Sequence, residues 1–244
     1  LHISTSGSTG IPKTSVFTRE QIHGAARASL EMLPIHKGDE VLLCMDLRYV
    51  GSKMLVIRTL LSGGQLTVLP PSSNPMKNFH RKSVKYAAFV PLQIHEILND
   101  TESLKKLGEI STVIIGGGQV HLDDELKLRE LSSKVYHTYG MTETISHVAL
   151  RNISRGDIYY TMLPGLKCRT EESGCMSFYV DYLGGWITTQ DLGECSENYK
   201  FKWIGRNDLM INTGGVKVFA DQLEEKIRHT LESQFGIAQF VVTG

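Results

Sequence analysis

A run of hydroxylated residues and glycines near the start of the sequence ends in a lysine and could hold phosphate. The hydroxyl donors are Thr5, Ser6, Ser8 and Thr9, the glycines that permit bends are Gly7 and Gly10, and the cation is Lys13. Glycine permits bends that point successive backbone N–H groups the same way, while hydroxyls and an ammonium add further donors. Pro12 stands where a Walker A loop needs glycine, so that loop type is excluded. A flexible linker is the alternative, but linkers rarely end in Pro-Lys directly after a strand, which favours a phosphate site.

Four later runs carry groups that could contact a nucleotide. They are the glycine turn Gly116-Gly117-Gly118, the run Tyr139-Gly140-Met141-Thr142-Glu143, residues 189–193 around Asp191, and residues 203–208 with Arg206 and Asp208. The first three each have an ordinary structural explanation: a strand-to-helix turn, a Thr-Glu helix cap, and an aspartate in a turn at a strand end. For the Thr-Glu pair, its position downstream of the phosphate run favours the chemical interpretation.

In order, these runs resemble the motifs of the AMP-forming acyl-adenylate superfamily, which includes acyl-CoA synthetases, luciferases and peptide-synthetase adenylation domains. The first resembles its T-S-G-S-T-G-x-P-K signature, and the later ones resemble Y-G-x-T-E, T-x-D-x-G and G-R-x-D. The resemblance extends from Thr5 to Val218, nearly the whole chain. Motifs that are modestly specific alone become specific in this order and at these separations.

The resemblance implies ATP and Mg²⁺ as cofactors and gives the phosphate-side residues their roles. Thr142 would donate a hydrogen bond to the α-phosphate, and Glu143 would ligate Mg²⁺, which prefers carboxylate and phosphate oxygens. Lys13 would neutralise phosphate charge. Thr142, Glu143 and Lys13 are therefore the expected catalytic residues.

The resemblance also assigns residues to the nucleoside. The glycine turn would pass along the adenine face, because backbone without side chains can approach a flat base, and Tyr139 and Gly140 belong to the same AMP-binding set. Asp191 would accept hydrogen bonds from both ribose hydroxyls, which is a usual way to bind a cis-diol. Arg206 would bind ribose or phosphate oxygens.

CoA is the expected co-substrate. The resemblance implies that a carboxylate attacks the α-phosphorus of ATP to give an acyl-adenylate, and that a thiol then releases AMP, with the protein supplying positioning and charge stabilisation. Asp208 would be the hinge of a mobile small domain, and Gly214 and Gly215 would lie at the CoA channel. The family's lysine-bearing loop and its leading strands are expected in sequence beyond Gly244 and before Leu1.

Cations near the expected acyl pocket indicate an acid with two carboxylates. Lys53 and Arg58 lie on the helix that in this family lines the pocket, and His147 follows the Thr-Glu motif. Burying a lone cation is costly, so a pocket cation implies an anionic partner. Both segments resemble the menaquinone-pathway 2-succinylbenzoate–CoA ligases, and Lys53 is the favoured carboxylate partner. In the alternative interpretation, Lys53 and Arg58 face solvent.

Other interpretations stay open at this level. Another acyl- or aryl-CoA ligase, an adenylation module that loads a carrier protein, and a nucleotide-binding protein without ligase activity all agree with the same motifs. A structural or interaction protein has no positive feature in its favour.

Alternating strand and helix patterns predict an α/β fold with a mostly parallel, covered sheet. Short strands after position 151 predict a smaller antiparallel sheet. We expect residues 1–207 to form a large adenylating domain that lacks its N-terminal part, and residues 208–244 to begin a small α+β domain.

Composition narrows the class of partner. The sequence has 26 basic and 26 acidic residues, a balance that gives no broad footprint for nucleic acid. Its longest apolar runs are too short to span a bilayer, so we expect no membrane insertion. Four cysteines without a C-x-x-C pair favour reduced thiols in a cytoplasmic protein, although Cys168 and Cys175 flank a predicted turn and could pair. Small molecules are the expected partners, and a homo-oligomer is left open.

Overall fold

The computed structural model describes residues 2–5, 13–80, 83–213, 216–236, 240 and 242. The chain divides into two units, the first formed by Leu1–Leu166 with Val180–Gly185 and the second by Lys167–Tyr179 with Trp186–Gly244. The expected division into domains 1–207 and 208–244 stays a prediction. No helix in the described ranges has the length and apolar character needed to cross a membrane.

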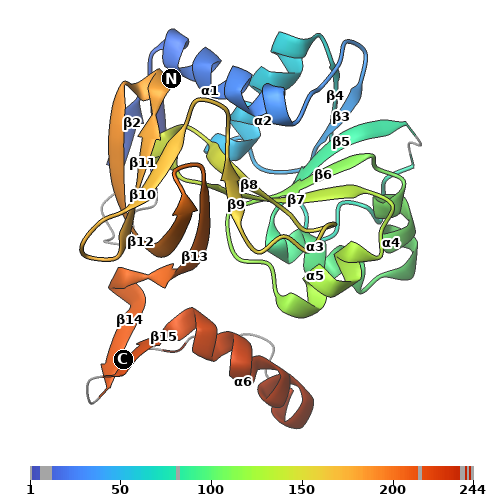
Figure 1. The fold of residues 1–244 in the computed structure, drawn as a ribbon. Coiled ribbons are helices and arrows are strands. Elements are labelled where there is room, and N and C mark those ends of the chain that lie inside the picture. The colour runs from blue at the N-terminus through green and yellow to red at the C-terminus, as the bar shows by residue number, and fades with distance from the viewer. Residues whose placement is uncertain are drawn as a thin grey trace. The chain divides into compact units, whose positions relative to one another are not determined.

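A mostly parallel sheet forms the centre of the first unit (Figure 1). Its strand order is β9-β8-β7-β6-β5-β3-β4, and every pairing from β4 to β7 is parallel. The strands are β3 (Glu40–Leu43), β4 (Gln65–Val68), β5 (Val84–Phe89), β6 (Thr112–Ile115), β7 (Lys134–Gly140), β8 (His147–Asn152) and β9 (Tyr160–Met162). β8 and β9 continue the sheet antiparallel to β7. A separate hairpin pairs β1 (His2–Thr5) with β2 (Lys13–Val16).

Helices cover both faces of this sheet, as the sequence pattern predicts (Figure 1). α1 (Arg19–Met32) and α2 (Val50–Ser62) lie on one face, and α3 (Pro91–Leu98), α4 (Thr101–Gly108) and α5 (Leu122–Arg129) lie on the other. A capping box begins α1: the Thr18 hydroxyl accepts from the Gln21 backbone N–H, and the Gln21 side chain accepts from the Thr18 N–H. α2 ends at Gly63, whose φ of 67° suits glycine.

Apolar residues from the strands fill the space beneath both helix layers. Val113, Ile115 and Phe89 pack with residues of α3 to α5 in the larger cluster. Met54 and Ile145 belong to a smaller cluster with residues of α1 and the segment before it. The sheet therefore forms a rigid layer whose strand ends can position side chains.

The second unit is built mainly from antiparallel strands. β10 (Lys167–Thr170) pairs with β11 (Cys175–Val180), and β12 (Gly185–Glu197) pairs with β13 (Lys200–Arg206). β14 (Met210–Thr213) and β15 (Val216–Phe219) form a two-stranded sheet that leads into α6 (Ala220–Phe235). The predicted antiparallel sheet is thus confirmed.

Some details differ from what the sequence pattern indicates. β12 continues to Glu197, so Asp191 lies inside a strand and not in a turn at a strand end. A bulge between Leu192 and Gly193 accommodates the glycine there. The pairing of Cys168 with Cys175 is not seen, because the register places Cys168 opposite Phe178 and all four thiols are free.

Candidate active site

The phosphate run lies between the two strands of the N-terminal hairpin. Thr5 at the end of β1 and Lys13 at the start of β2 are directly paired, so the run between them is closed at its base. Residues 6–12 lie outside the described part of the chain. The expected contacts of Ser6, Gly7, Ser8, Thr9 and Gly10 therefore stay predictions, as do those of the Thr5 and Lys13 side chains. Gly214 and Gly215 also lie outside the described residues.

The Thr-Glu motif forms a single helical turn between β7 and β8, η1 (Thr142–Thr144). Thr144 stabilises it: its hydroxyl accepts from the Met141 N–H at 3.1 Å and donates to the Ser146 carbonyl at 2.6 Å. The Glu143 side chain is exposed, and Thr142 is half-buried. The turn therefore presents the two expected ligands at the end of a central strand.

Ile145 reverses the chain directly after this turn. Its φ of 67° is unusual for a β-branched residue, and its side chain is fully buried in the cluster beside α1. At this residue the chain changes from the exposed Glu143 to the buried Ser146 and His147. Strained backbone of this kind persists only where the surroundings hold it, and it is common at functional sites.

Gly140 is required by close backbone packing. A Cβ atom at this position would lie 2.3 Å from both the Ser146 carbonyl oxygen and the His147 Cα. Neither backbone atom can move without shifting β8. Glycine in the Tyr-Gly pair thus allows the segment that carries His147 to cross directly over the end of β7.

The glycine turn follows β6 and is held by the neighbouring strands. The Gly116 N–H donates to the Phe89 carbonyl at 3.1 Å, and a Cβ on Gly116 would lie 2.4 Å from the Thr138 hydroxyl. Gly117 has a φ of 86°, a conformation that favours glycine. Gly117 and Gly118 are exposed. The turn is thus an exposed stretch of bare backbone fixed at its start.

A buried arginine forms the centre of a polar cluster in the first unit. Arg58 is 2% exposed, and its Nη1 donates to the hydroxyls of Ser29 at 3.3 Å and Ser146 at 3.5 Å. The Ser29 hydroxyl is also 2.8 Å from His147 Nε2. Burial lowers the pKa of Arg58. Burial and the Arg58 charge hold the pKa of His147 well below its ordinary value.

This cluster lacks an anion. No carboxylate in the described part of the chain pairs with Arg58. Arg58 Nε and the Tyr86 hydroxyl are buried, and neither has a hydrogen-bond partner among the described residues. A buried charge without a counterion costs several kcal/mol, roughly, even after relaxation. The arrangement therefore favours an anionic ligand.

The structure brings Arg58 and His147 together but leaves Lys53 outside this cluster. Lys53 is half-buried on α2, and its ammonium forms no hydrogen bond or ion pair with another described residue. The alternative in which Arg58 faces solvent is wrong. Sequence reasoning missed Ser29, because a serine on the inner face of a helix has no signal until the partner strand is placed.

In the second unit Asp191 and Arg206 are direct neighbours across β12 and β13. The Trp203 indole N–H donates to Asp191 Oδ1 at 3.1 Å, and the Asp191 N–H donates to the Thr189 hydroxyl at 3.0 Å. These contacts fix the carboxylate on the strand. Trp203 was missed as a residue that orients Asp191, although its place three positions before Arg206 could have suggested it.

Arg206 forms a two-pronged ion pair with the expected hinge residue. Its Nε and Nη2 donate to the two carboxylate oxygens of Asp208 at 2.8 and 2.6 Å. This pair lowers the pKa of Asp208. The guanidinium is thus held at the start of the short turn η3 (Asn207–Leu209).

The exposed Glu143 fits the Mg²⁺ that the resemblance implies. Its carboxylate has no hydrogen bond or ion pair to another described residue, and no group of three His, Cys, Asp or Glu side chains gathers there or elsewhere in the described ranges. Mg²⁺ is usually bound by one or two carboxylates together with substrate phosphates and water. One free carboxylate at the end of β7 meets that requirement.

Comparison with known proteins agrees with this geometry. The profile of the AMP-binding enzyme family matches residues 2–169. The chain is 26% identical over 240 residues to the 2-succinylbenzoate–CoA ligase of Escherichia coli K12, covering 91% of this chain and 51% of that protein. It thus spans about half the length of the curated relatives it matches.

Two solved structures share the fold. One is an acyl-CoA synthetase (AMP-forming)/AMP-acid ligase II-like protein from Dyadobacter fermentans, with a TM-score of 0.78, 33% identity, and 95% of this chain and 67% of that chain covered. The other is the O-succinylbenzoate coenzyme A synthetase of Bacillus subtilis in complex with ATP and magnesium ion. It has a TM-score of 0.83 and 20% identity, with 100% of this chain and 56% of that chain covered.

Proposed function

The chain belongs to the AMP-binding enzyme family, and we propose that it serves an ATP-dependent acid–CoA ligase that adenylates a dicarboxylic acid, 2-succinylbenzoate, and passes the acyl group to CoA. Curated relatives named as 2-succinylbenzoate–CoA ligases support the reaction class. The observation that carries the choice of acid is the buried Arg58, which has no counterion among the described residues.

An acid with two carboxylates explains the buried Arg58 better than an acid with one. In the proposed reaction one carboxylate is consumed at the α-phosphorus of ATP, so a monocarboxylate would leave Arg58 unpaired. A second carboxylate would accept hydrogen bonds from Arg58, and such charge-assisted bonds are the stronger kind. His147 belongs to the same cluster, and it follows Glu143 by four positions in the sequence, which supports a place for the second carboxylate near the proposed phosphate ligands.

Lys53 has a lesser part in this proposal than the sequence suggested. It is half-buried near the start of α2, and its flexible ammonium would serve as a mobile point charge for an anionic substrate. Arg58 is the better permanent partner, because its guanidinium is already buried and oriented by two serine hydroxyls.

The remaining groups would act by positioning and charge. Thr142 would donate to the α-phosphate, and Lys13 would neutralise the departing pyrophosphate. Asp191 would hold the ribose hydroxyls, and Arg206 would bind ribose or phosphate oxygens once released from Asp208. Mg²⁺, when bound by Glu143 and phosphate, would neutralise charge that develops on the phosphate oxygens. Asp208 would be the hinge, and Gly214 and Gly215 would lie by the CoA channel.

An assay of pyrophosphate release from ATP with a panel of acids tests the proposal. 2-Succinylbenzoate should support release, and CoA should then cause AMP release. Two matched analogues each lack one carboxylate: 4-oxo-4-phenylbutyrate and 2-butyrylbenzoate. Both should be much poorer substrates. The analogue that lacks the carboxylate attacked at the α-phosphorus has no group to activate, and the analogue that lacks the other carboxylate leaves Arg58 without an anionic partner. Equal rates with benzoate or a fatty acid would contradict the choice of acid, whereas transfer to a carrier protein in place of CoA would contradict the ligase class.

A further inference from the structure

A buried histidine lies directly behind the glycine turn. His137, on β7, is 2% exposed, and its Nε2 is 2.8 Å from the Gly118 carbonyl oxygen. On its other side, Nδ1 is 2.7 Å from the Tyr160 hydroxyl and 3.3 Å from Nη2 of Arg151. The imidazole therefore connects an interior polar cluster to the exposed turn.

The partners of His137 define one tautomer. A carbonyl oxygen only accepts, so Nε2 must carry the proton that bonds to Gly118. Nδ1 must then be the unprotonated nitrogen, which suits the donors on Tyr160 and Arg151. Burial, followed by the Arg151 charge, lowers the pKa of His137 to about 4, so this neutral form persists at neutral pH.

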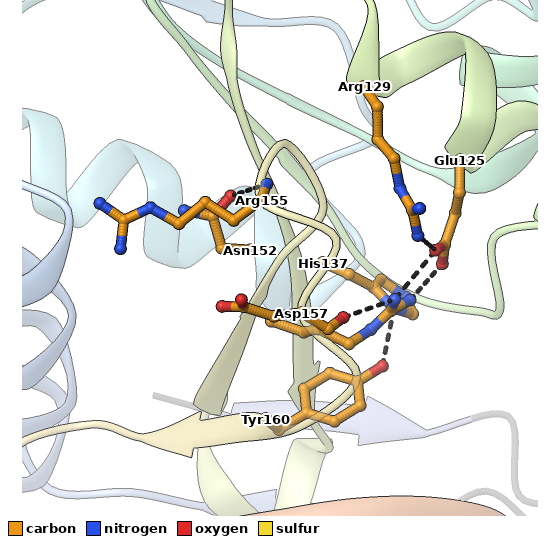
Figure 2. Close-up of polar contacts among 8 residues, drawn as sticks. Glu125, Arg129, His137, Asn152, Arg155, Asp157 and Tyr160 are labelled. Carbon is orange, nitrogen blue, oxygen red and sulfur yellow. Dashed lines mark hydrogen bonds and ion pairs between the residues drawn. The ribbon is translucent and has the colours of Figure 1, made fainter.

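The cluster behind the imidazole holds it in place (Figure 2). Figure 2 shows Glu125, His137 and Tyr160 pointing toward one another from α5, β7 and β9. Arg151 pairs with both carboxylate oxygens of Glu125 and lies 5.5 Å from the Tyr160 ring centroid. Because Glu125 neutralises the guanidinium, the charge near the imidazole has a buried counterion and the ring stays fixed.

The bond to Gly118 sets which way its peptide unit faces. With the Gly118 carbonyl turned inward to the imidazole, the N–H of the same peptide unit, on Gln119, points the opposite way. Gly117, Gly118 and Gln119 are all exposed. The bare backbone of the turn thus has one orientation, fixed at Gly116 by β5 and at Gly118 by His137.

We propose that His137 is a positioning residue for the nucleobase: in its Nε2–H form it fixes the Gly118 peptide so that the glycine turn presents a flat backbone surface to adenine. The inference rests on the proposed function and on the family resemblance, by which this turn would border the base. Because His137 contacts the turn and would act on the base only through it, its loss should weaken only interactions made through the base.

A pair of ligands with and without a base tests this. Affinities of ATP and of ribose 5-triphosphate are measured by calorimetry for the wild type, His137→Phe and His137→Gln, with His36→Gln as an exposed control. His137→Phe keeps a ring but removes the donor, and should weaken ATP binding about five- to tenfold, as expected for one lost hydrogen bond. Ribose 5-triphosphate binding should not change. His137→Gln, which keeps an N–H donor, should recover most of the loss.

Spectroscopy gives an independent readout. Two-bond ¹H–¹⁵N correlations of the wild type should show His137 as the Nε2–H tautomer at neutral pH, with or without ATP. An Nδ1–H tautomer would overturn the inference and leave the proposed function intact. Unchanged ATP affinity in His137→Phe, or an equal loss of affinity for ATP and ribose 5-triphosphate, would also overturn the inference and leave the proposed function intact. Wild-type protein that binds no ATP would contradict the proposed function itself, and the inference with it.

If His137→Phe does not fold, Tyr160→Phe decides. It removes only the hydroxyl that donates to Nδ1 and should weaken ATP binding about two- to threefold, again without affecting ribose 5-triphosphate. No change, or an equal change for both ligands, would overturn the inference.

Discussion

Arg58 on α2 and His147 on β8 meet at one hydroxyl, that of Ser29 on α1. Because the guanidinium can only donate, it donates to the serine oxygen, which leaves the serine proton for His147 Nε2. His147 is then a neutral acceptor, in agreement with its lowered pKa. The cluster keeps a single positive charge on Arg58, ready for an anion.

Replacing Arg58 should not destabilise the unliganded protein, even though this arginine is proposed to bind the acid. Arg58→Met removes a buried, unpaired charge and keeps an apolar chain of similar length, so the free energy of unfolding without ligand should stay the same or rise by about 1–4 kcal/mol. Chemical denaturation measures it. A purely structural arginine would behave differently: its loss would destabilise the unliganded protein by about 3–5 kcal/mol.

Removing the strand-borne carboxylate of the second unit should weaken nucleotide binding. Asp191→Ala deletes the proposed acceptor for two ribose hydroxyls, and hydrogen bonds to a charged group contribute about 1.5–3 kcal/mol each. ATP affinity should fall at least about tenfold. The substitution should not change the affinity for 2′,3′-dideoxy-ATP, because that nucleotide lacks both ribose hydroxyls that would bond to Asp191. Glu194→Ala, an exposed acid on the same strand, is the control; an equal effect on both nucleotides would show that Asp191 does not bind the ribose.

Alanine substitutions at Gly140 and Gly51 compare a crowded glycine position with an open one. An alanine at 140 would place Cβ 2.3 Å from the backbone of Ser146 and His147, so Gly140→Ala should lower the melting temperature and weaken acid binding by displacing His147. Gly51, near the start of α2, has nothing within 4 Å of such a Cβ. Gly51→Ala should stabilise the protein by up to about 1 kcal/mol through helix propensity. Thermal melts of both variants give the answer, and a neutral Gly140→Ala would contradict the packing described.

Stability should fall as the pH drops below about 6.5. His137 faces Arg151, Glu125 and Tyr160, and its folded pKa of about 4 lies below the value of about 6.5 in an unfolded chain. Between these values the unfolded state binds the proton and the folded state does not, so the free energy of unfolding decreases with falling pH. Above about 6.5 both states are neutral and this contribution is constant. In His137→Phe the slope between pH 6.5 and 4 should be smaller, although His147 still contributes; an unchanged slope would refute the assignment.

Local sequence patterns predicted the central elements, because they depend on nearby residues. The cap of α1 at Thr18 and the apolar run of β6 both depend on neighbouring residues. α4 has a mainly polar composition, although Asp100 caps it through the Ser103 N–H. The full length of β12 is harder to predict, because Asp191 and Gly193 are typical of turns and the bulge that admits them depends on β13.

The candidate site was predictable in its residue types but not in its partnerships. The glycine turn, the Thr-Glu pair and Asp191 are motifs that stand out in the sequence. Ser29 and His147 are 118 positions apart, so their contact could only come from the fold. Burial of Arg58 goes against the usual exposure of arginine, which is why Lys53 appeared the better carboxylate partner.

The most direct test of the account measures how Arg58 discriminates between two acyl-adenylate analogues. Non-hydrolysable sulfamoyl adenosines carrying either the 2-succinylbenzoyl group or its counterpart without the free carboxylate are titrated into the wild type and Arg58→Met. The wild type should prefer the carboxylate-bearing analogue by about ten- to a hundredfold, and Arg58→Met should lose that preference while binding the other analogue normally. A preference that survives in Arg58→Met, or a wild type that binds both analogues equally, would contradict the claim that this arginine holds the second carboxylate.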